Sequence, residues 1–344
     1  MDISKLEFAT LPDLVRRHAR AAPRRIALIE GARQWDYAAL DRHIDQATAA
    51  LQRCGIGPGD TVALCAAASI EFVAVFLGTL RAGAAVAPLA PSVTPAALHG
   101  MAHDSRAKLV FIDAAAGLVL DGAAPTPGDP DRPPPLRIAL DGSAAGTPLQ
   151  DWLGASDRTP TAVTIAPHWP FNIIYSSGTT GAPKGIVQPH AMRWAHVQRG
   201  VNYDYSEQTV ALLSTPLYSN TTLVVFVPTL AHGGTVVLMT RFDAAQYLEL
   251  AQRHRVTHTM LVPVQYRRLL ALPDFDRFDL SSYQVKFATS APFAGPLKAE
   301  VLRRTHDIRQ REEEIALRLV SAAEARATSA IATRSPELIF ASYS

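Results

Sequence analysis

Apolar positions in the first third of the chain alternate between short strand-like runs and stretches with helical spacing. Residues 24–30 (RRIALIE) predict a strand. The stretch behind them predicts a helix, which Asp36 can cap and Gly55 can end. The apolar face of that helix comprises Leu40, Ile44, Ala47 and Leu51.

The same alternation continues along most of the chain. Ser69 and Gly83 bound a further helix, and Thr94 and Pro95 open another. Helices are also expected at about 190–199 and at 242–254. Strands are expected at 61–66, 85–89, 108–113, 171–176, 209–215, 235–240, 257–263 and 284–290. Strands that alternate with helices predict an α/β fold with a parallel sheet and crossover helices.

Changes in composition suggest three parts. Six of the eleven residues from Pro125 to Pro135 are proline, which predicts an irregular surface connection. We expect a first α/β subdomain over residues 1–165 and a second over 166–304. Residues 305–344 are charged and alanine-rich and are expected to form an atypical helical tail.

Composition narrows the possible partners and compartment. Basic residues exceed acidic ones by 33 − 31 = 2, which gives no case for a nucleic-acid partner. The apolar region 62–90 is interrupted by charged residues, so we expect no membrane span, and the N-terminus does not resemble a signal peptide. Cys54 and Cys65 are interpreted as reduced core residues, and no cysteine or histidine cluster has metal-ligand spacing. These features favour a cytoplasmic protein without a metal site of its own.

Residues 175–185 (YSSGTTGAPKG) carry the strongest chemical signal in the chain. Glycines let backbone N–H groups line a concavity, hydroxyls add short donors, and Lys184 adds a positive charge, which together suit a polyphosphate. A flexible Ser/Gly turn is the alternative, but the position directly after a buried strand favours ligand binding. Pro183 before the lysine and Gly185 after it exclude a Walker A motif, which disfavours a P-loop kinase or ATPase.

This segment is similar to the phosphate-binding signature of the adenylate-forming superfamily. That superfamily includes acyl-CoA and aryl-CoA synthetases, peptide-synthetase adenylation domains and luciferases. The likeness runs from about Leu11 to about Arg304. It implies the layered αβαβα large domain of these enzymes, with stacked, parallel-rich sheets. It also implies the activity of an AMP-dependent acyl-CoA synthetase, in which a carboxylic acid attacks ATP to give an acyl-adenylate that passes to CoA. ATP, Mg²⁺ and CoA are the implied cofactor and co-substrates.

The resemblance assigns roles to individual residues. Lys184 is the implied catalytic residue, and the loop residues around the phosphates are Ser176, Ser177, Gly178, Thr179, Thr180, Gly181, Lys184 and Gly185. Tyr218 and Ser219 match the segment that lines the acid pocket, although the family usually has histidine where Ser219 stands. The alternative is that Ser219 or Asn220 only caps a helix. The apolar run behind them favours a fatty or aryl acid.

Residues 289–293 (TSAPF) resemble the loop that stacks on adenine, which makes Ser290, Ala291 and Pro292 the adenine-side candidates. The alternative is a helix-opening Ala-Pro turn. His190, directly behind the glycine loop, is interpreted as a helix-start or packing residue.

Several features of the superfamily are not found after Arg304: the aromatic-Gly-x-Thr-Glu segment, the ribose-binding aspartate, the hinge and the small C-terminal domain with its lysine. We therefore expect a truncated form that lacks the C-terminal domain and has impaired or no activity. The alternative is a non-catalytic remnant that binds nucleotide or acid weakly. The oligomeric state stays open.

Overall fold

The computed structural model describes residues 3–122, 134–154, 159–176, 184–289, 291–305 and 318–320. The contact pattern divides the chain into two compact units, Met1–Phe242 and Asp243–Ser344. We describe each unit by itself. The expected division at residues 165 and 304 stays a prediction.

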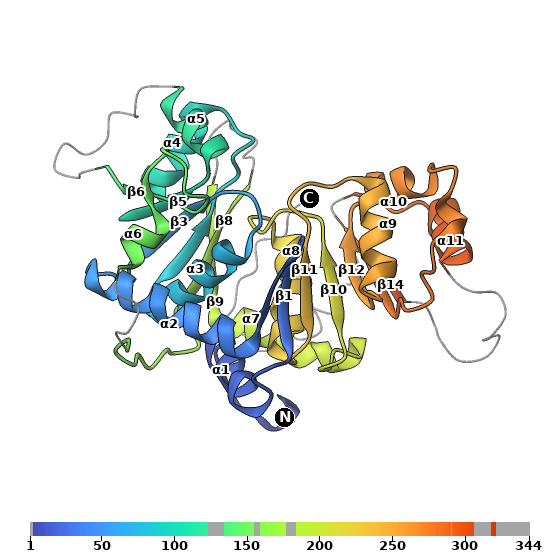
Figure 1. The fold of residues 1–344 in the computed structure, drawn as a ribbon, viewed down its shortest axis with the longest axis horizontal. Helices are drawn as coiled ribbons and strands as arrows, with labels where there is room; N and C mark the ends of the chain where they lie inside the picture. The colour runs from blue at the N-terminus through green and yellow to red at the C-terminus, as the bar shows by residue number, and fades with distance from the viewer. Residues whose placement is uncertain are drawn as a thin grey trace, which may run out of the picture. The chain divides into compact units, whose positions relative to one another are not determined.

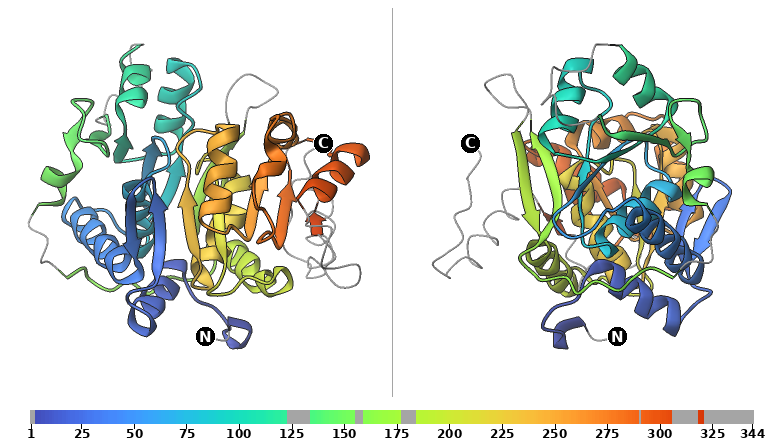
Figure 2. Two further views of the ribbon diagram at one scale, coloured as in Figure 1. Left: turned by 45° about the vertical axis from the view of Figure 1, so that its right-hand side comes forward. Right: turned by 90° about the vertical axis from the view of Figure 1, so that its left-hand side faces the viewer.

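A seven-stranded sheet forms one half of the first unit, in the order β7-β6-β5-β3-β4-β8-β9 (Figure 1). Its strands are β3 (Thr61–Cys65), β4 (Ala85–Pro88), β5 (Leu109–Ile112), β6 (Leu136–Ala139), β7 (Thr147–Pro148), β8 (Pro170–Ser176) and β9 (Lys184–Pro189). All neighbouring strands are parallel except β8 and β9, which form an antiparallel hairpin. The hairpin lies at the edge of the sheet, where its two strands run side by side (Figure 2).

A second sheet in the same unit joins segments that are far apart in the sequence. Its strands are β1 (Ile26–Glu30), β2 (Arg33–Asp36), β10 (Val210–Leu213) and β11 (Thr235–Leu238). β1 pairs in parallel with β11 and antiparallel with β2, while β10 and β11 are parallel. This pairing gives the unit the layered, parallel-rich architecture that the sequence predicts.

Helices pack between and around the two sheets. They are α1 (Leu11–Ala21), α2 (Tyr37–Arg53), α3 (Ile70–Arg81), α4 (Pro95–Asp104), α5 (Ala114–Asp121), α6 (Leu149–Leu153), α7 (His190–Arg199) and α8 (Asn220–Ala231). α3 contacts β1 of one sheet and β3 and β4 of the other, and nearly all of its residues are buried. Phe76 of α3 packs edge-on against Phe171 of β8 and Phe226 of α8. The centre of the unit is therefore an apolar helical layer between two sheets.

The helix starts follow the predicted caps. Asp36, Ser69 and Thr94 each accept a hydrogen bond from the backbone N–H three residues later, over 2.7, 3.0 and 3.3 Å. These side chains satisfy N–H groups that have no partner inside the helix. The sequence therefore locates α2, α3 and α4 correctly at their N-terminal ends.

The second unit contains the parallel strands β12 (His258–Leu261), β13 (Val285–Ala288) and β14 (Arg318–Val320). Its helices are α9 (Ala244–Arg253), α10 (Pro263–Leu270) and α11 (Gly295–Arg304). β14 differs from the helix expected for this part of the tail, because its backbone pairs with the edge of β13.

Two further expectations need correction. Residues 184–189 form β9, whereas the sequence suggested only a loop before α7. Cys65 is buried as expected. Cys54 is exposed, because it caps the C-terminal end of α2 and does not belong to the apolar face of that helix.

Among the described residues, no helix is long and apolar enough to cross a membrane.

Candidate functional site

The two described ends of the predicted phosphate segment belong to the hairpin of β8 and β9. Ser176 and Lys184 form the last pair of the ladder, and the next pair joins Tyr175 to Gly185. Lys184 and Gly185 are exposed on the edge strand. The predicted site residues Ser177, Gly178, Thr179, Thr180 and Gly181 lie outside the described residues. The described part of the hairpin thus presents the lysine amine beside the strand end where α/β sheets bind ligands.

Close packing explains the glycine at position 185. A Cβ atom there would lie 3.0 Å from Cγ2 of Ile173, 3.1 Å from Oδ2 of Asp104 and 3.2 Å from the ring of Tyr175. These distances are shorter than ordinary van der Waals contacts, so a side chain would push the two strands apart or displace α4. Glycine is therefore the residue that fits at position 185 without moving these neighbours.

Tyr175 and Asp104 fix the same end of the hairpin to α4. The Tyr175 hydroxyl donates to Oδ2 of Asp104 over 2.6 Å. Burial, followed by this hydrogen bond, raises the pKa of Tyr175 well above its usual value, so the phenol stays protonated at neutral pH. The contact fixes the last residues of β8 and places the Asp104 carboxylate against the hairpin, close to Gly185.

His190 has the environment of a packing residue. It begins α7, is 3% exposed and lies edge-on against Phe171. Burial lowers its pKa to about 4, so the ring is neutral at physiological pH. This agrees with the role expected from the sequence.

The predicted acid-pocket residues lie between β10 and α8. Tyr218 and Ser219 are half-buried, and Ser219 occupies the N-cap position of α8 without a side-chain capping bond. Its backbone N–H donates to the carbonyl of Pro216. Two nearby buried atoms, Oγ of Ser214 and Oδ1 of Asn220, have no hydrogen-bond partner among the described residues. This turn therefore combines free polar atoms with the apolar helix behind it.

The adenine-side candidates belong to the second unit. Ala291 and Pro292 are exposed and lie between β13 and α11, and Ser290 lies outside the described residues. The turn follows the carboxyl end of a parallel strand, as the phosphate hairpin and the acid-pocket turn do in the first unit. Their roles stay predictions.

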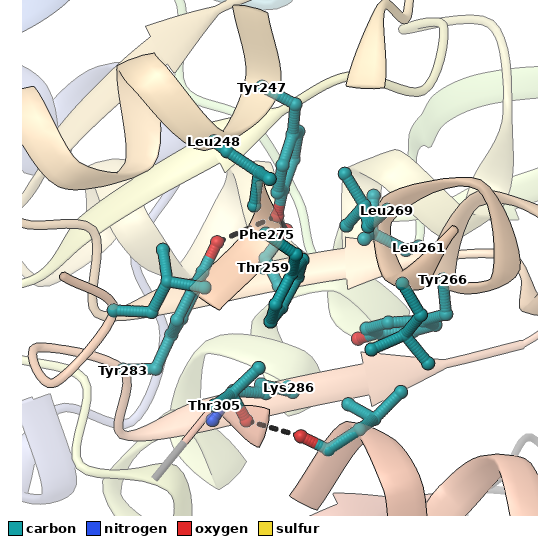
Figure 3. A pocket seen from close by; sticks show the side chains of 13 residues that line it. Tyr247, Leu248, Thr259, Leu261, Tyr266, Leu269, Phe275, Tyr283, Lys286 and Thr305 are labelled. Carbon is teal, nitrogen blue, oxygen red and sulfur yellow. Dashed lines mark hydrogen bonds between the residues drawn. The ribbon is translucent and has the colours of Figure 1, made fainter. Parts of the chain in front are cut away.

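The second unit also holds a small cavity that no sequence pattern predicts (Figure 3). Its volume is about 20 Å³, and apolar side chains and the rings of Tyr247, Tyr266 and Tyr283 line it. Tyr247 contacts both Thr259 and Tyr283 through its hydroxyl, over 2.7 and 2.9 Å. A space of this size holds about one water molecule and is far too small for a nucleotide or an acid.

Lys286 of β13 is a buried lysine that lines this cavity. It is 1% exposed, and its Nζ has no hydrogen-bond partner among the described residues. Nζ lies 4.9 Å from the centroid of the Tyr283 ring. Burial lowers the pKa of the amine to about 7. The sequence does not predict this burial. In a strand covered on one face, alternate side chains are exposed, and a lysine is expected on the exposed face; here both faces of β13 are covered.

The described residues offer little for binding a metal ion. No group of three or more His, Cys, Asp or Glu side chains there is arranged to hold a metal ion. The group of the described hairpin that could pair with an anion is the exposed amine of Lys184.

A layered α/β unit with a glycine-rich hairpin after a parallel strand defines a nucleotide-binding class of fold. The chain matches the AMP-binding enzyme family over residues 15–316 and belongs to that family. This confirms the resemblance to adenylate-forming enzymes that the glycine segment indicates.

Among its relatives, the feruloyl-CoA synthase of Amycolatopsis sp is 28% identical over 84% of this chain and 56% of its own length. The 4-coumarate–CoA ligase-like 9 of Oryza sativa subsp. japonica is 31% identical over 85% of this chain and 53% of its own length. The chain thus spans about half the length of these relatives.

Solved structures show the same fold. The N-terminal domain of FACL13 from Mycobacterium tuberculosis aligns with a TM-score of 0.77 and 24% identity, over 87% of this chain and 74% of that one. The anthranilate CoA ligase AuaEII in complex with anthranoyl-AMP aligns with a TM-score of 0.77 and 21% identity, over 89% of this chain and 60% of that one.

Proposed function

We propose that this chain activates a carboxylic acid with ATP to form an acyl-adenylate, which a thiol, CoA, then converts to a thioester. The observation that carries the proposal is the β8–β9 hairpin, which presents Lys184 and the tightly packed Gly185 at its tip. Membership of the AMP-binding family and the CoA ligases among the relatives support it.

The chemistry needs positive charge and N–H donors where the negative charge develops. An oxygen of the acid's carboxylate attacks the α-phosphorus of ATP, and the bond to the bridging oxygen breaks, which releases pyrophosphate. Lys184 is proposed to offset the charge of the β- and γ-phosphates during this step. Mg²⁺, which would arrive on the phosphate oxygens, adds further neutralising charge when bound. The thiolate sulfur then attacks the acyl carbon, and AMP leaves.

The turn before α8 suggests the class of acid. α8 has an almost entirely apolar sequence from Leu223 to Ala231 and is largely buried, so the region behind Tyr218 is apolar. An apolar wall favours a fatty or aryl acid over a small polar acid. Relatives described as feruloyl-CoA synthase and as fatty acid–acyl-carrier-protein ligase are consistent with both classes and with two types of thiol acceptor.

ATP–pyrophosphate exchange with a panel of fatty and aryl acids tests the proposal. We expect exchange with at least one acid, and loss of exchange in Lys184→Ala. A matched control is Lys108→Ala, because Lys108 is an exposed lysine that pairs with Asp60 away from the hairpin. Exchange that Lys184→Ala leaves intact would contradict the role of the hairpin.

The second candidate is a protein that binds nucleotide or acid weakly without catalysis. Absence of exchange with every acid, combined with ATP binding in a calorimetric titration, would replace the first proposal with this one.

A further inference from the structure

Arg193 of α7 lies at the base of the phosphate hairpin and contacts both of its strands. Its Nε and Nη2 donate to Oδ1 of Asn172 in β8, over 3.2 and 2.9 Å. Nη2 also donates to Oε1 of Gln188 in β9. Asn172 completes the triangle by donating from Nδ2 to the same Gln188 oxygen over 3.1 Å. One guanidinium therefore joins two strands that face each other across the ladder.

The position of this triangle along the hairpin is significant. Asn172 and Gln188 are a direct pair, and the register shifts between Asn172 and Pro170, so the pair adjoins a bulge. β9 is an edge strand, and its one partner among the described strands is β8. A one-residue slip of β9 would turn Lys184 to the opposite face. The contacts of Arg193 select the register that places Lys184 opposite Ser176, about 14 Å further along the hairpin.

The electrostatics of Arg193 are unusual for a residue that only packs. It is 2% exposed, and its hydrogen-bond acceptors among the described residues are amide oxygens, with no carboxylate. The centroid of the Phe171 ring lies 5.6 Å from its guanidinium carbon, and Nη1 has no hydrogen-bond partner among the described residues. An apolar side chain of the same length would fill this space without the cost of burying a charge.

Arg81 shows the contrast within the same unit. It is also buried, but it donates to the carboxylates of Asp41 and Asp45. Its charge is neutralised, and its contacts join helices. The charge of Arg193 is not neutralised in this way, and its contacts join the two strands that carry the candidate site.

We propose that Arg193 is a positioning residue that clamps β8 and β9 in register and so places Lys184 for the phosphates of ATP. The binding role rests on the proposed function. The clamp itself is a property of the hairpin and can be tested without any ligand.

The test compares the chain with its Arg193→Met variant by hydrogen exchange and by calorimetric titration with ATP. Nδ2 of Asn172 still donates to Gln188 in the variant, whereas Oδ1 of Asn172 loses its donor. The cost of this unpaired acceptor offsets the gain from removing a buried charge, so we expect an unfolding midpoint close to that of the unaltered chain. Amides of residues 170–176 and 184–189 should exchange about tenfold faster, and the Kd for ATP should rise about tenfold, because a misplaced binding group loses affinity steeply. Arg199→Met on the same helix is the control, because Arg199 donates to Ala195 of its own helix.

Unchanged exchange in the two strands would overturn the clamp. Faster exchange with an unchanged Kd would leave Arg193 as a structural tie and overturn its positioning role. If the unaltered chain binds no ATP, the proposed function fails, while the exchange data still decide the clamp. Should Arg193→Met fail to fold, Gln188→Met removes the contact to β9, keeps the one to Asn172 and is read by the same two measurements.

Discussion

The hydroxyl of Tyr175 and the carboxylate of Asp104 form a 2.6 Å hydrogen bond between the end of β8 and the last residue of α4. The bond links two elements that are separated by 71 positions in the sequence. Because Asp104 is exposed, its carboxylate would be hydrated if the bond were lost, which limits the cost of breaking it. The contact therefore serves mainly to define the position of β8.

Tyr175→Phe removes this bond and keeps the ring. We expect the free energy of unfolding to fall by about 0.5–1.5 kcal/mol, the usual net value of one hydrogen bond. Urea unfolding measures the loss. In a double-mutant cycle with Asp104→Asn, the second change should cost little once the tyrosine hydroxyl is gone; fully additive losses would show that the two groups do not interact.

Gly185→Ala introduces a methyl group 3.0 to 3.2 Å from Ile173, Asp104 and Tyr175. We expect a loss of about 1–3 kcal/mol in unfolding free energy and weaker binding of ATP, because the hairpin must open to admit the methyl group. Gly100→Ala is the matched control. Its Cβ would meet nothing within 4 Å, and alanine favours the helix in which it lies. Equal effects of the two substitutions would contradict the packing argument.

Much of the fold follows from local signals. Asp36, Ser69 and Thr94 predict their helices because a side-chain cap acts within three residues of its own position. β9 escaped prediction because its sequence, KGIVQP, contains a glycine and a proline, and only pairing with β8 makes it a strand. Local propensity is a weak guide where a partner strand decides the outcome.

The candidate site also has parts that the sequence predicts and parts that depend on tertiary contacts. The glycine segment predicts a phosphate site from its residue types alone, and the roles of its lysine and glycines stay predictions. The Arg193 triangle carries no such signal, because it depends on which residues of β8 and β9 face each other. Burial of Lys286 likewise depends on the tertiary environment of β13, whereas the strand itself is predicted correctly.

Lys286 should make stability depend on pH. Burial lowers its pKa from the usual 10.5 to about 7 in the folded protein. Between these values the unfolded chain binds more protons than the folded one, so stability rises as the pH increases from about 7 to about 10.5. The full difference is on the order of 5 kcal/mol.

Lys286→Met should remove this contribution and raise stability at pH 7, because an apolar side chain replaces an unpaired amine. Urea unfolding at pH 7 and pH 9 measures the change. Lys298→Met, on the half-buried surface of α11 in the same unit, should keep the pH dependence of the unaltered chain. If Lys286→Met retains that dependence in full, the amine is not the group that titrates.

Arg81 should be the most costly arginine to remove from the first unit. It is 8% exposed and donates to Asp41 over 2.6 Å, to Asp45 over 2.9 Å and to the carbonyl of Pro12 over 2.8 Å. In Arg81→Met, the carboxylates of Asp41 and Asp45 keep their ion pairs with Arg16 but lose those with Arg81. Because Arg16 is 30% exposed and only partly compensates them, we expect a loss of about 2–4 kcal/mol.

Arg16→Met provides the comparison, since it removes a more exposed partner of the same two carboxylates. We expect a loss below about 1 kcal/mol, as for most exposed ion pairs. Urea unfolding at low and high salt separates the two variants, because salt screens the exposed pair more than the buried one. Similar losses of unfolding free energy in Arg81→Met and Arg16→Met would mean that burial does not determine how much these ion pairs stabilise the fold. That outcome would also weaken the expectation that Arg193, buried without a carboxylate, can be replaced by methionine without loss of stability.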